Sequence, residues 1–194
     1  MTSEKRQLRS VDPSTLPKHF DVRAAEVRWN EAWEKSGTYH YDPSRPRQET
    51  HVVDTPPPTA SGALHPGHAC SYTHTDVVVR YKRMRGMNIF YPMGWDDNGL
   101  PTERRVQNYY HVRCNPNVPY DPDLSIEQPT GKRRKKPPLE VSRANFIELC
   151  YRVTTEDEQA YMTLCKRLGL SVDWRQEYQT IDDHCRRIAQ LSFR

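Results

Sequence analysis

Two histidines, His65 and His68, have the residue type and the spacing to bind a phosphate group. They lie three residues apart, so both would share one face of the first turn of a helix. The N-terminus of a helix carries unpaired N–H groups and a partial positive charge, which attract anions. Gly67, between them, has no Cβ and lets a ligand approach the backbone closely. These features predict a phosphate-binding site.

Metal binding is an alternative use of the same two histidines. A zinc site needs three or four protein ligands, and no cysteine or carboxylate lies at a suitable local spacing. The five cysteines are odd in number, widely spaced and without a Cys-x-x-Cys pair, which argues against a zinc ribbon or a disulfide framework. We therefore predict no tightly bound metal and a reducing, cytoplasmic location. A purely structural place on a helix surface is the remaining alternative for the histidines.

A strand, a helix and a second strand must position this site. Residues 50–55 read as a buried strand that ends at Pro56, because proline cannot donate to a sheet ladder. A helix is predicted over 67–85 and a second buried strand over 88–93, so the two strands should pair in parallel. Ligands of open parallel sheets bind beyond the carboxyl ends of the strands, where the histidines would lie. The residues expected on the inner face of this helix are Ala69, Tyr72, Val77, Tyr81 and Met84.

Two segments on either side of this helix resemble one protein family. Residues 56–68, Pro-Pro-Pro-Thr-Ala-Ser-Gly-Ala-Leu-His-Pro-Gly-His, resemble the His-x-Gly-His motif of class I aminoacyl-tRNA synthetases. Residues 94–103, Gly-Trp-Asp-Asp-Asn-Gly-Leu-Pro-Thr-Glu, resemble a second segment of that family, and both are most similar to its valine-specific members. Two linked motifs in the right order are far more specific than one short pattern.

The resemblance covers nearly the whole chain and implies an α/β fold. The expected architecture is the first half of a Rossmann-like nucleotide-binding fold with parallel strands. An N-terminal helix would precede it, and helices leading to a connective (editing) insertion would follow. The predicted regions are an N-terminal arm and helix (1–48), a catalytic half-domain (49–113), a proline-rich and basic linker (114–141) and a helical region (142–194).

The resemblance also implies a reaction, its substrates and its site residues. The family member would use ATP with Mg²⁺ to activate valine as valyl-adenylate and would transfer the valyl group to tRNA(Val), as a monomer when complete. His65 and His68 would be the catalytic residues. The implied nucleotide-binding residues are Pro58, Thr59, Gly62, His65, Gly67 and His68, and the implied amino-acid-binding residues are Pro57, Thr59 and Asp96.

Asp96 and Asp97 lie in the loop that follows the second predicted strand. Acidic residues in such a loop are often turn or cap residues, which is one interpretation. The resemblance implies instead that Asp96 pairs with the substrate ammonium group. We favour the second interpretation because the loop would lie beside the phosphate site.

The remaining sequence predicts further helices around this unit. Asp21 can cap a helix that ends at Gly37, with Trp29 and Trp33 as core anchors or, less favoured, as a ligand-stacking pair. After a predicted loss of order over 113–138, one helix should begin at Ser142 or Asn145. A capping box at Thr155 and Glu158 predicts a new helix that ends at Gly169, and a last one should begin at Ile181, with Ile188 and Leu191 inward.

Composition excludes some classes of protein and leaves others open. The net charge of +4 is compatible with a polyanionic partner, and a basic run at 132–136 is either a solvated segment or a contact with tRNA phosphates. No stretch approaches the roughly 20 apolar residues of a membrane span, and the N-terminus lacks the apolar core of a signal peptide.

One departure from the family pattern bears on activity. The chain contains no Lys-Met-Ser-Lys-Ser segment, which in the family closes over the triphosphate, and the editing and anticodon-binding parts are absent. We therefore expect an N-terminal segment that is inactive alone. The alternatives are an isoleucyl- or leucyl-type synthetase and a non-catalytic nucleic-acid-binding module that uses the 132–136 run.

Overall fold

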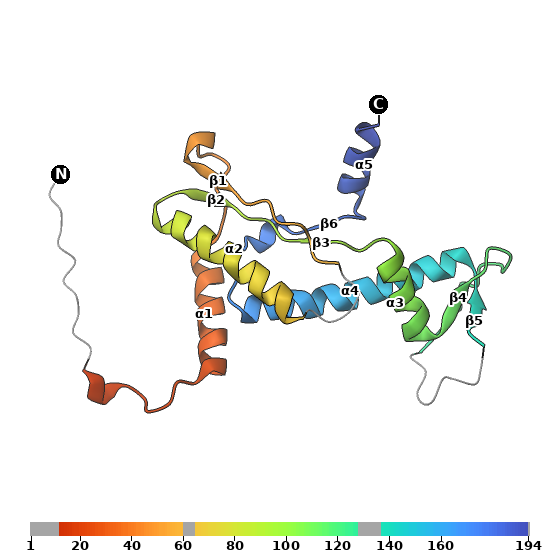
Figure 1. The fold of residues 1–194 in the computed structure, drawn as a ribbon, viewed down its shortest axis with the longest axis horizontal. Helices are drawn as coiled ribbons and strands as arrows, with labels where there is room; N and C mark the ends of the chain where they lie inside the picture. Colours follow the sequence, from red (N-terminus) through yellow and green to blue (C-terminus); the bar gives the residue numbers. More distant parts are fainter. Residues whose placement is uncertain (1–11, 60–64, 128–136, 194) are drawn as a thin grey trace.

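The computed structural model describes residues 12–59, 65–127 and 137–193, and Figure 1 shows their arrangement. One or two short strands separate successive helices along the chain. The helices are α1 (Val22–Ser36), α2 (Pro66–Met84), α3 (Leu100–Tyr110), α4 (Arg143–Arg167) and α5 (Asp183–Leu191). The strands are β1 (Thr50–Val52), β2 (Asn88–Phe90), β3 (Gly94–Trp95), β4 (Val112–Cys114), β5 (Leu139–Val141) and β6 (Tyr178–Gln179).

The described strands form three parallel pairs. β1 pairs with β2, β3 with β6, and β4 with β5, and the registers join Thr50 to Asn88, Gly94 to Tyr178 and Val112 to Leu139. The predicted α/β class with parallel strands is therefore confirmed.

Prolines make the first two strands shorter than predicted. β1 ends at Val52, and only the Val53 N–H continues toward β2, donating to the Phe90 carbonyl at 2.9 Å. β2 ends at Phe90, two residues before Pro92. Residues 91–93 then bond to a different segment, because the Tyr91 and Met93 carbonyls accept from Asp173 and Tyr178.

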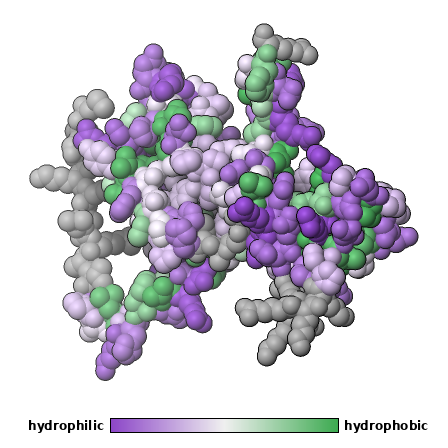
Figure 2. All heavy atoms as spheres, turned by 45° about the vertical axis from the view of Figure 1, so that its right-hand side comes forward, coloured by the Kyte–Doolittle hydropathy of each residue, from purple (hydrophilic) through white to green (hydrophobic). Residues whose placement is uncertain are grey.

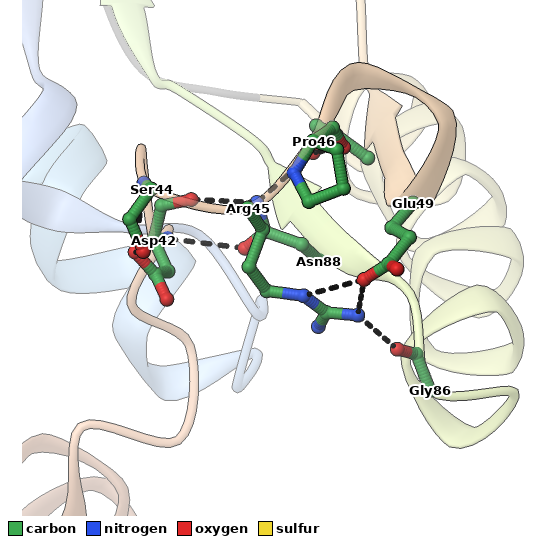
Figure 3. A network of polar contacts seen from close by, with 8 residues as sticks. Asp42, Ser44, Arg45, Pro46, Glu49, Gly86 and Asn88 are labelled. Atoms are coloured by element: carbon green, nitrogen blue, oxygen red, sulfur yellow. Dashed lines mark hydrogen bonds and ion pairs between the residues drawn. The ribbon is translucent and has the colours of Figure 1, made fainter.

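The connector before β1 is bound to β2 by side-chain contacts (Figure 3). Asp42 donates its N–H to the Asn88 side chain at 3.0 Å, and the Asn88 amide donates back to the Asp42 carbonyl at 2.8 Å. Arg45 pairs with Glu49 at 2.8 Å and also donates to the Gly86 carbonyl. These contacts fix the position of the connector relative to β2, and so the register in which β1 pairs with β2.

Helix α1 has the predicted boundaries, but only one of its two tryptophans lies on its inner side. Asp21 caps it by accepting from the Ala24 N–H, and Gly37 ends it in the left-handed conformation with φ of 61°. The helix packs mainly against α4. Trp33 lies against Tyr39 with the two rings tilted by 46°, and Trp29 stacks on Trp33 from outside. Trp29 is 48% exposed, so the prediction of Trp29 as a core anchor is wrong.

The buried face of α2 differs from the predicted one and includes a carboxylate between apolar residues. Val77, Tyr81 and Met84 are exposed, while Tyr72, Asp76 and Val79 are buried. Asp76 accepts from the Ser171 N–H at 2.8 Å and also from its hydroxyl. The turn after α4 leaves backbone groups that α2 must satisfy, and this requirement sets the buried face.

Helix α4 is one continuous helix of 25 residues, so the predicted break before Thr155 is wrong. Ser142 caps its start, and Gly169 follows its end with φ of 70°. The Thr155 hydroxyl does not cap a new helix, because it donates to the Tyr151 carbonyl one turn earlier at 2.9 Å.

Two hydrophobic clusters lie along α4, which spans both because of its length. Phe146, Leu149 and Val153 belong to a cluster with Val106 of α3, β4 and β5. Tyr161 and Cys165 belong to the other, which centres on Trp95. The residues of this second cluster from the sheet and α2 are Val53, Tyr72, Val79, Ile89, Tyr91, Met93 and Trp95.

Order does not fade after residue 113 as predicted, as far as the described residues extend. The β4–β5 pair brackets the segment, and Asp121 exchanges two hydrogen bonds with the Asn145 side chain at 3.0 and 2.7 Å. The basic run at 132–136 lies outside the described residues. The four-region division of the chain stays a prediction.

Helix α5 begins two residues after Ile181 and contains no buried residue. Ile188 and Leu191 are each 50% exposed, so the prediction that they face inward is wrong. Figure 1 shows α5 standing away from the other helices, and Figure 2 shows its hydrophobic side chains along one side. No helix in the described residues is long and apolar enough to cross a membrane.

Candidate active site

The two predicted histidines form a reciprocal cap at the start of α2. His65 is the N-cap residue, and its Nδ1 accepts from the Gly67 N–H at 3.1 Å. His68 is the third residue of the helix, and its Nδ1 accepts from the His65 N–H at 3.4 Å. The ring centroids lie 4.0 Å apart. The histidines are therefore together, with His65 just before the first turn.

This cap determines the hydrogen-bonding capacity of both rings. A neutral imidazole whose Nδ1 accepts a hydrogen bond carries its proton on Nε2, so each ring has one remaining donor. Partial burial and the neighbouring His65 lower the pKa of His68, which favours this neutral form. The arrangement provides two Nε2–H donors beside the helix N-terminus.

Gly67 has a second reason to be glycine besides the approach of a ligand. A Cβ at this position would lie 2.8 Å from Cε1 and 3.0 Å from Nδ1 of His65. The ring of His65 therefore occupies the space that a side chain at position 67 would need.

The proline-rich segment before the histidines is held by two tyrosines. Tyr72 of α2 donates to the Pro56 carbonyl at 2.9 Å, and Tyr161 of α4 donates to the Thr59 carbonyl at 3.2 Å. Pro58 is buried, whereas Pro57 and Thr59 are half-buried. Gly62, predicted to bind nucleotide, lies outside the described residues.

Asp96 contacts the end of this segment. Its N–H donates to the Pro58 carbonyl at 2.9 Å, and Thr59 and Asp96 form a parallel bridge. The Thr59 hydroxyl donates to Oδ2 of Asp96 at 3.1 Å, while Asn98 and Thr180 donate to Oδ1 at 3.3 and 3.5 Å. The structure thus brings together Pro58, Thr59 and Asp96, which the resemblance had assigned to nucleotide and amino acid.

Sequence reasoning missed a buried acidic pair beside Asp96. Asp97 and Glu158 are each 4% exposed, and burial together with the mutual charge raises the pKa of Asp97 to about 7. From the sequence, Asp97 has no predicted role beyond a turn or cap residue, and Glu158 is predicted as part of a capping box. The adjacent acids at 96 and 97 were the only local signal, since nothing in the sequence links Asp97 to α4.

Thr180 was missed as well. Its hydroxyl accepts from the Asp97 N–H at 3.2 Å and from the Asn98 amide at 3.0 Å. Thr180 follows β6, so only the β3–β6 pairing brings it to this loop.

Comparison with known families decides which family this architecture represents. The family described as "tRNA synthetases class I (I, L, M and V)" matches residues 28–118 and 121–193. The chain belongs to this family. The resemblance of the two motif segments to class I synthetases is therefore confirmed.

Two relatives with more than 50% identity to this chain are both valine–tRNA ligases. The valine–tRNA ligase of Thermobifida fusca (strain YX) is 53% identical over 193 residues, which cover 100% of this chain and 21% of the relative. The valine–tRNA ligase of Salinispora tropica (strain ATCC BAA-916 / DSM 44818 / JCM 13857 / NBRC 105044 / CNB-440) is 54% identical over 178 residues, or 92% of this chain and 20% of the relative. This class I synthetase chain spans about a fifth of the length of these relatives.

A solved structure supports the fold of this class I synthetase chain. It is the crystal structure of the ternary complex of Agrobacterium radiobacter K84 agnB2 LeuRS-tRNA-LeuAMS. The TM-score is 0.63 at 21% identity, and the match covers 90% of this chain and 17% of that one. The likeness confirms the Rossmann-like α/β fold.

Proposed function

We propose that this chain is the first part of the catalytic domain of a valine–tRNA ligase. The proposed reaction activates valine with ATP to valyl-adenylate and then transfers the valyl group to tRNA(Val). The observation that carries the proposal is the 53% identity to a valine–tRNA ligase over the whole chain. The paired imidazoles and the contact of Thr59 with Asp96 support it independently.

The activation step requires little covalent participation by the protein. A carboxylate oxygen of valine attacks the α-phosphorus of ATP, and the bond to pyrophosphate breaks as pyrophosphate leaves with Mg²⁺. Catalysis then depends on positioning and on donors aimed at the charge that develops on the phosphoryl oxygens. The Nε2–H groups of His65 and His68 are the proposed donors. The other proposed nucleotide-binding residues are Pro58, Thr59, Gly62 and Gly67.

Asp96 is the proposed partner of the valine ammonium group. It accepts hydrogen bonds from Thr59, Asn98 and Thr180, which are all neutral. These bonds orient the carboxylate but do not neutralise it, so its charge is available to a cation. Pro57 and Thr59 would border the amino acid on the side of the proline-rich segment.

The remaining partners follow from the proposed reaction. ATP would arrive as its Mg²⁺ complex, with the ion on phosphate oxygens, because Mg²⁺ is commonly bound through substrate phosphates. We further propose a monomeric complete enzyme acting in the cytoplasm on tRNA(Val). The alternative is activation of isoleucine or leucine. ATP–pyrophosphate exchange that depends on one of these amino acids and not on valine would reveal it.

The experiment that tests the proposal replaces both imidazoles while it preserves the helix cap. In the complete ligase, His65→Asn keeps a favoured N-cap residue, and His68→Ala keeps a good helix-forming residue and loses only the 3.4 Å bond to the His65 N–H. Both changes remove the Nε2–H donors. Valine-dependent ATP–pyrophosphate exchange should fall about 10- to 100-fold for each donor, the cost of a hydrogen bond to a charged group.

The control is His74→Asn, an exposed histidine on the same helix. This variant should retain full exchange activity, and circular dichroism should show unchanged helix content in all variants. Undiminished exchange by the double variant His65→Asn/His68→Ala would contradict the proposal.

A further inference from the structure

Asp97 and Glu158 form an acidic pair whose oxygens lack donors. With both groups ionised, neither oxygen of Asp97 nor Oε1 of Glu158 has a donor, and all three atoms are buried. Oε2 of Glu158 accepts from the Gln179 amide at 2.8 Å. Buried carboxylate oxygens without donors are costly, so the pair needs either a proton or a bound cation.

The charged groups around the pair make full ionisation unfavourable. Burial is the main cause of the raised pKa of both groups; Asp96 on the same loop raises that of Asp97 further, and Glu177, next to β6, that of Glu158. From α3, Glu103 lines a cavity of about 190 Å³ that Asp97 also lines. The buried Thr102 hydroxyl lines the same cavity without a partner. Every charged neighbour named here is an acid.

A single shared proton resolves this arrangement. A protonated carboxyl group donates to a carboxylate, and two adjacent acids in a low dielectric hold one proton between them. Burial raises the pKa of both carboxyl groups, which favours the form of the pair that holds one proton.

The pair connects the amino-acid loop to α4. Asp97 directly follows Asp96, and Thr180 bonds to both, accepting from the Asp97 N–H and donating to Asp96. Glu158 lies one helical turn before Tyr161, which holds the Thr59 carbonyl. Helix α4 therefore acts on both partners of the Thr59–Asp96 contact. Tyr161 binds Thr59, and Glu158 faces Asp97, the neighbour of Asp96.

We propose that Asp97 and Glu158 share one proton and act as positioning residues that hold Asp96 for the substrate ammonium group. The inference rests on the proposed function, since it assigns Asp96 to valine. Loss of the shared proton at higher pH leaves two like charges together, so the loop should lose its attachment to α4. The KM for valine should then rise with pH while kcat changes less.

The first arm of the test uses the 194-residue chain and needs no activity. Carboxyl ¹³C NMR should show one carboxyl group of the pair that remains protonated at pH 6 and titrates near pH 7. Asp97→Asn should abolish that titration. The proposal is overturned if both groups titrate below pH 5, or if millimolar Mg²⁺ or ammonium alone shifts both resonances as a bound cation would.

The second arm measures valine-dependent exchange by the complete ligase between pH 6 and pH 8.5. The KM for valine should rise about three- to tenfold, the value of one ordinary hydrogen bond. Asp97→Asn and Glu158→Gln both imitate the protonated pair, so each should flatten this profile. Asp97→Ala removes the contact and should give a high KM at every pH.

Glu156→Gln is the matched control, because it makes the same change at an exposed position of α4. It should keep the profile of the unsubstituted enzyme. A profile equally steep in Asp97→Asn and Glu158→Gln would overturn the proposal. Absence of valine-dependent exchange at any pH would instead refute the proposed function, and the NMR arm would still decide whether the proton is shared.

Discussion

Gly94 shows how a single residue limits the approach of two strands. It pairs with Tyr178 in the β3–β6 register, and a Cβ at position 94 would overlap the ring of Tyr178. The glycine therefore lets the ring cover the strand that leads to Asp96. The nearby Trp95 is completely buried and donates to Glu177 at 2.5 Å, so this strand has little freedom to move aside.

Substitution of Gly94 by alanine should destabilise the chain through this overlap. We expect a loss of about 1–3 kcal/mol in the free energy of unfolding, as for an added methyl group in a packed core. Denaturant unfolding of the 194-residue chain measures it.

The second variant, Gly94→Ala/Tyr178→Val, removes the ring and should be less destabilised than the sum of the single changes. Strict additivity would show that the ring is not the cause.

At the residue scale, sequence predicted the histidine pair and not the acidic pair. His65 and His68 are local partners, so their proximity followed from spacing alone. Asp97 and Glu158 lie far apart in sequence, and each had an acceptable local role as a turn or cap residue. The distance along the chain explains the difference, since propensity and spacing carry no information about remote partners.

At the element scale, the boundaries set by local caps were predictable. Asp21 and Gly37 bound α1 as expected, because both cap interactions lie within a few residues of the helix end. The predicted break in α4 is wrong because a threonine hydroxyl can also bond within a continuous helix. The Thr155 hydroxyl donates to the Tyr151 carbonyl of the preceding turn. The continuous helix spans both hydrophobic clusters, which favours it over two short helices.

The pairing of the strands was only partly predictable. The parallel β1–β2 pair followed from the strand, helix and strand order. β4 and β5 were missed because three-residue strands carry little periodic signal, and β6 lies 84 positions after its partner at Gly94.

Helix α5 should be the least stable helix of the isolated chain. It contains no buried residue, and isolated helices shorter than about 12–15 residues are marginal in water. Hydrogen exchange followed by mass spectrometry should show little protection over Asp183–Leu191 and strong protection over the middle of α4. Equal protection of the two helices would contradict this prediction.

At the scale of the whole molecule, the chain contains some of the groups that the proposed reaction would use. It contains the paired imidazoles and Asp96, but no Lys-x-Ser-Lys segment occurs in its sequence. The charge that develops on the phosphoryl oxygens would therefore meet only part of the stabilisation that the family uses.

The isolated chain should consequently be a poor catalyst. We expect valine-dependent ATP–pyrophosphate exchange at least about a hundredfold below that of the complete ligase, the typical cost of losing one transition-state donor. Both proteins are assayed at equal concentration, with folding of the chain checked by circular dichroism. Exchange at the rate of the complete ligase would contradict the expectation.

The separation of β3 from β6 has a consequence for synthesis on the ribosome. Tyr178 is translated 84 residues after Gly94. At roughly 5–20 residues per second, the nascent strand waits about 4–17 s for its partner. During that interval β3 lacks its partner β6, so the indole of Trp95 is not yet covered. This is the period in which we expect a chaperone to bind the nascent chain.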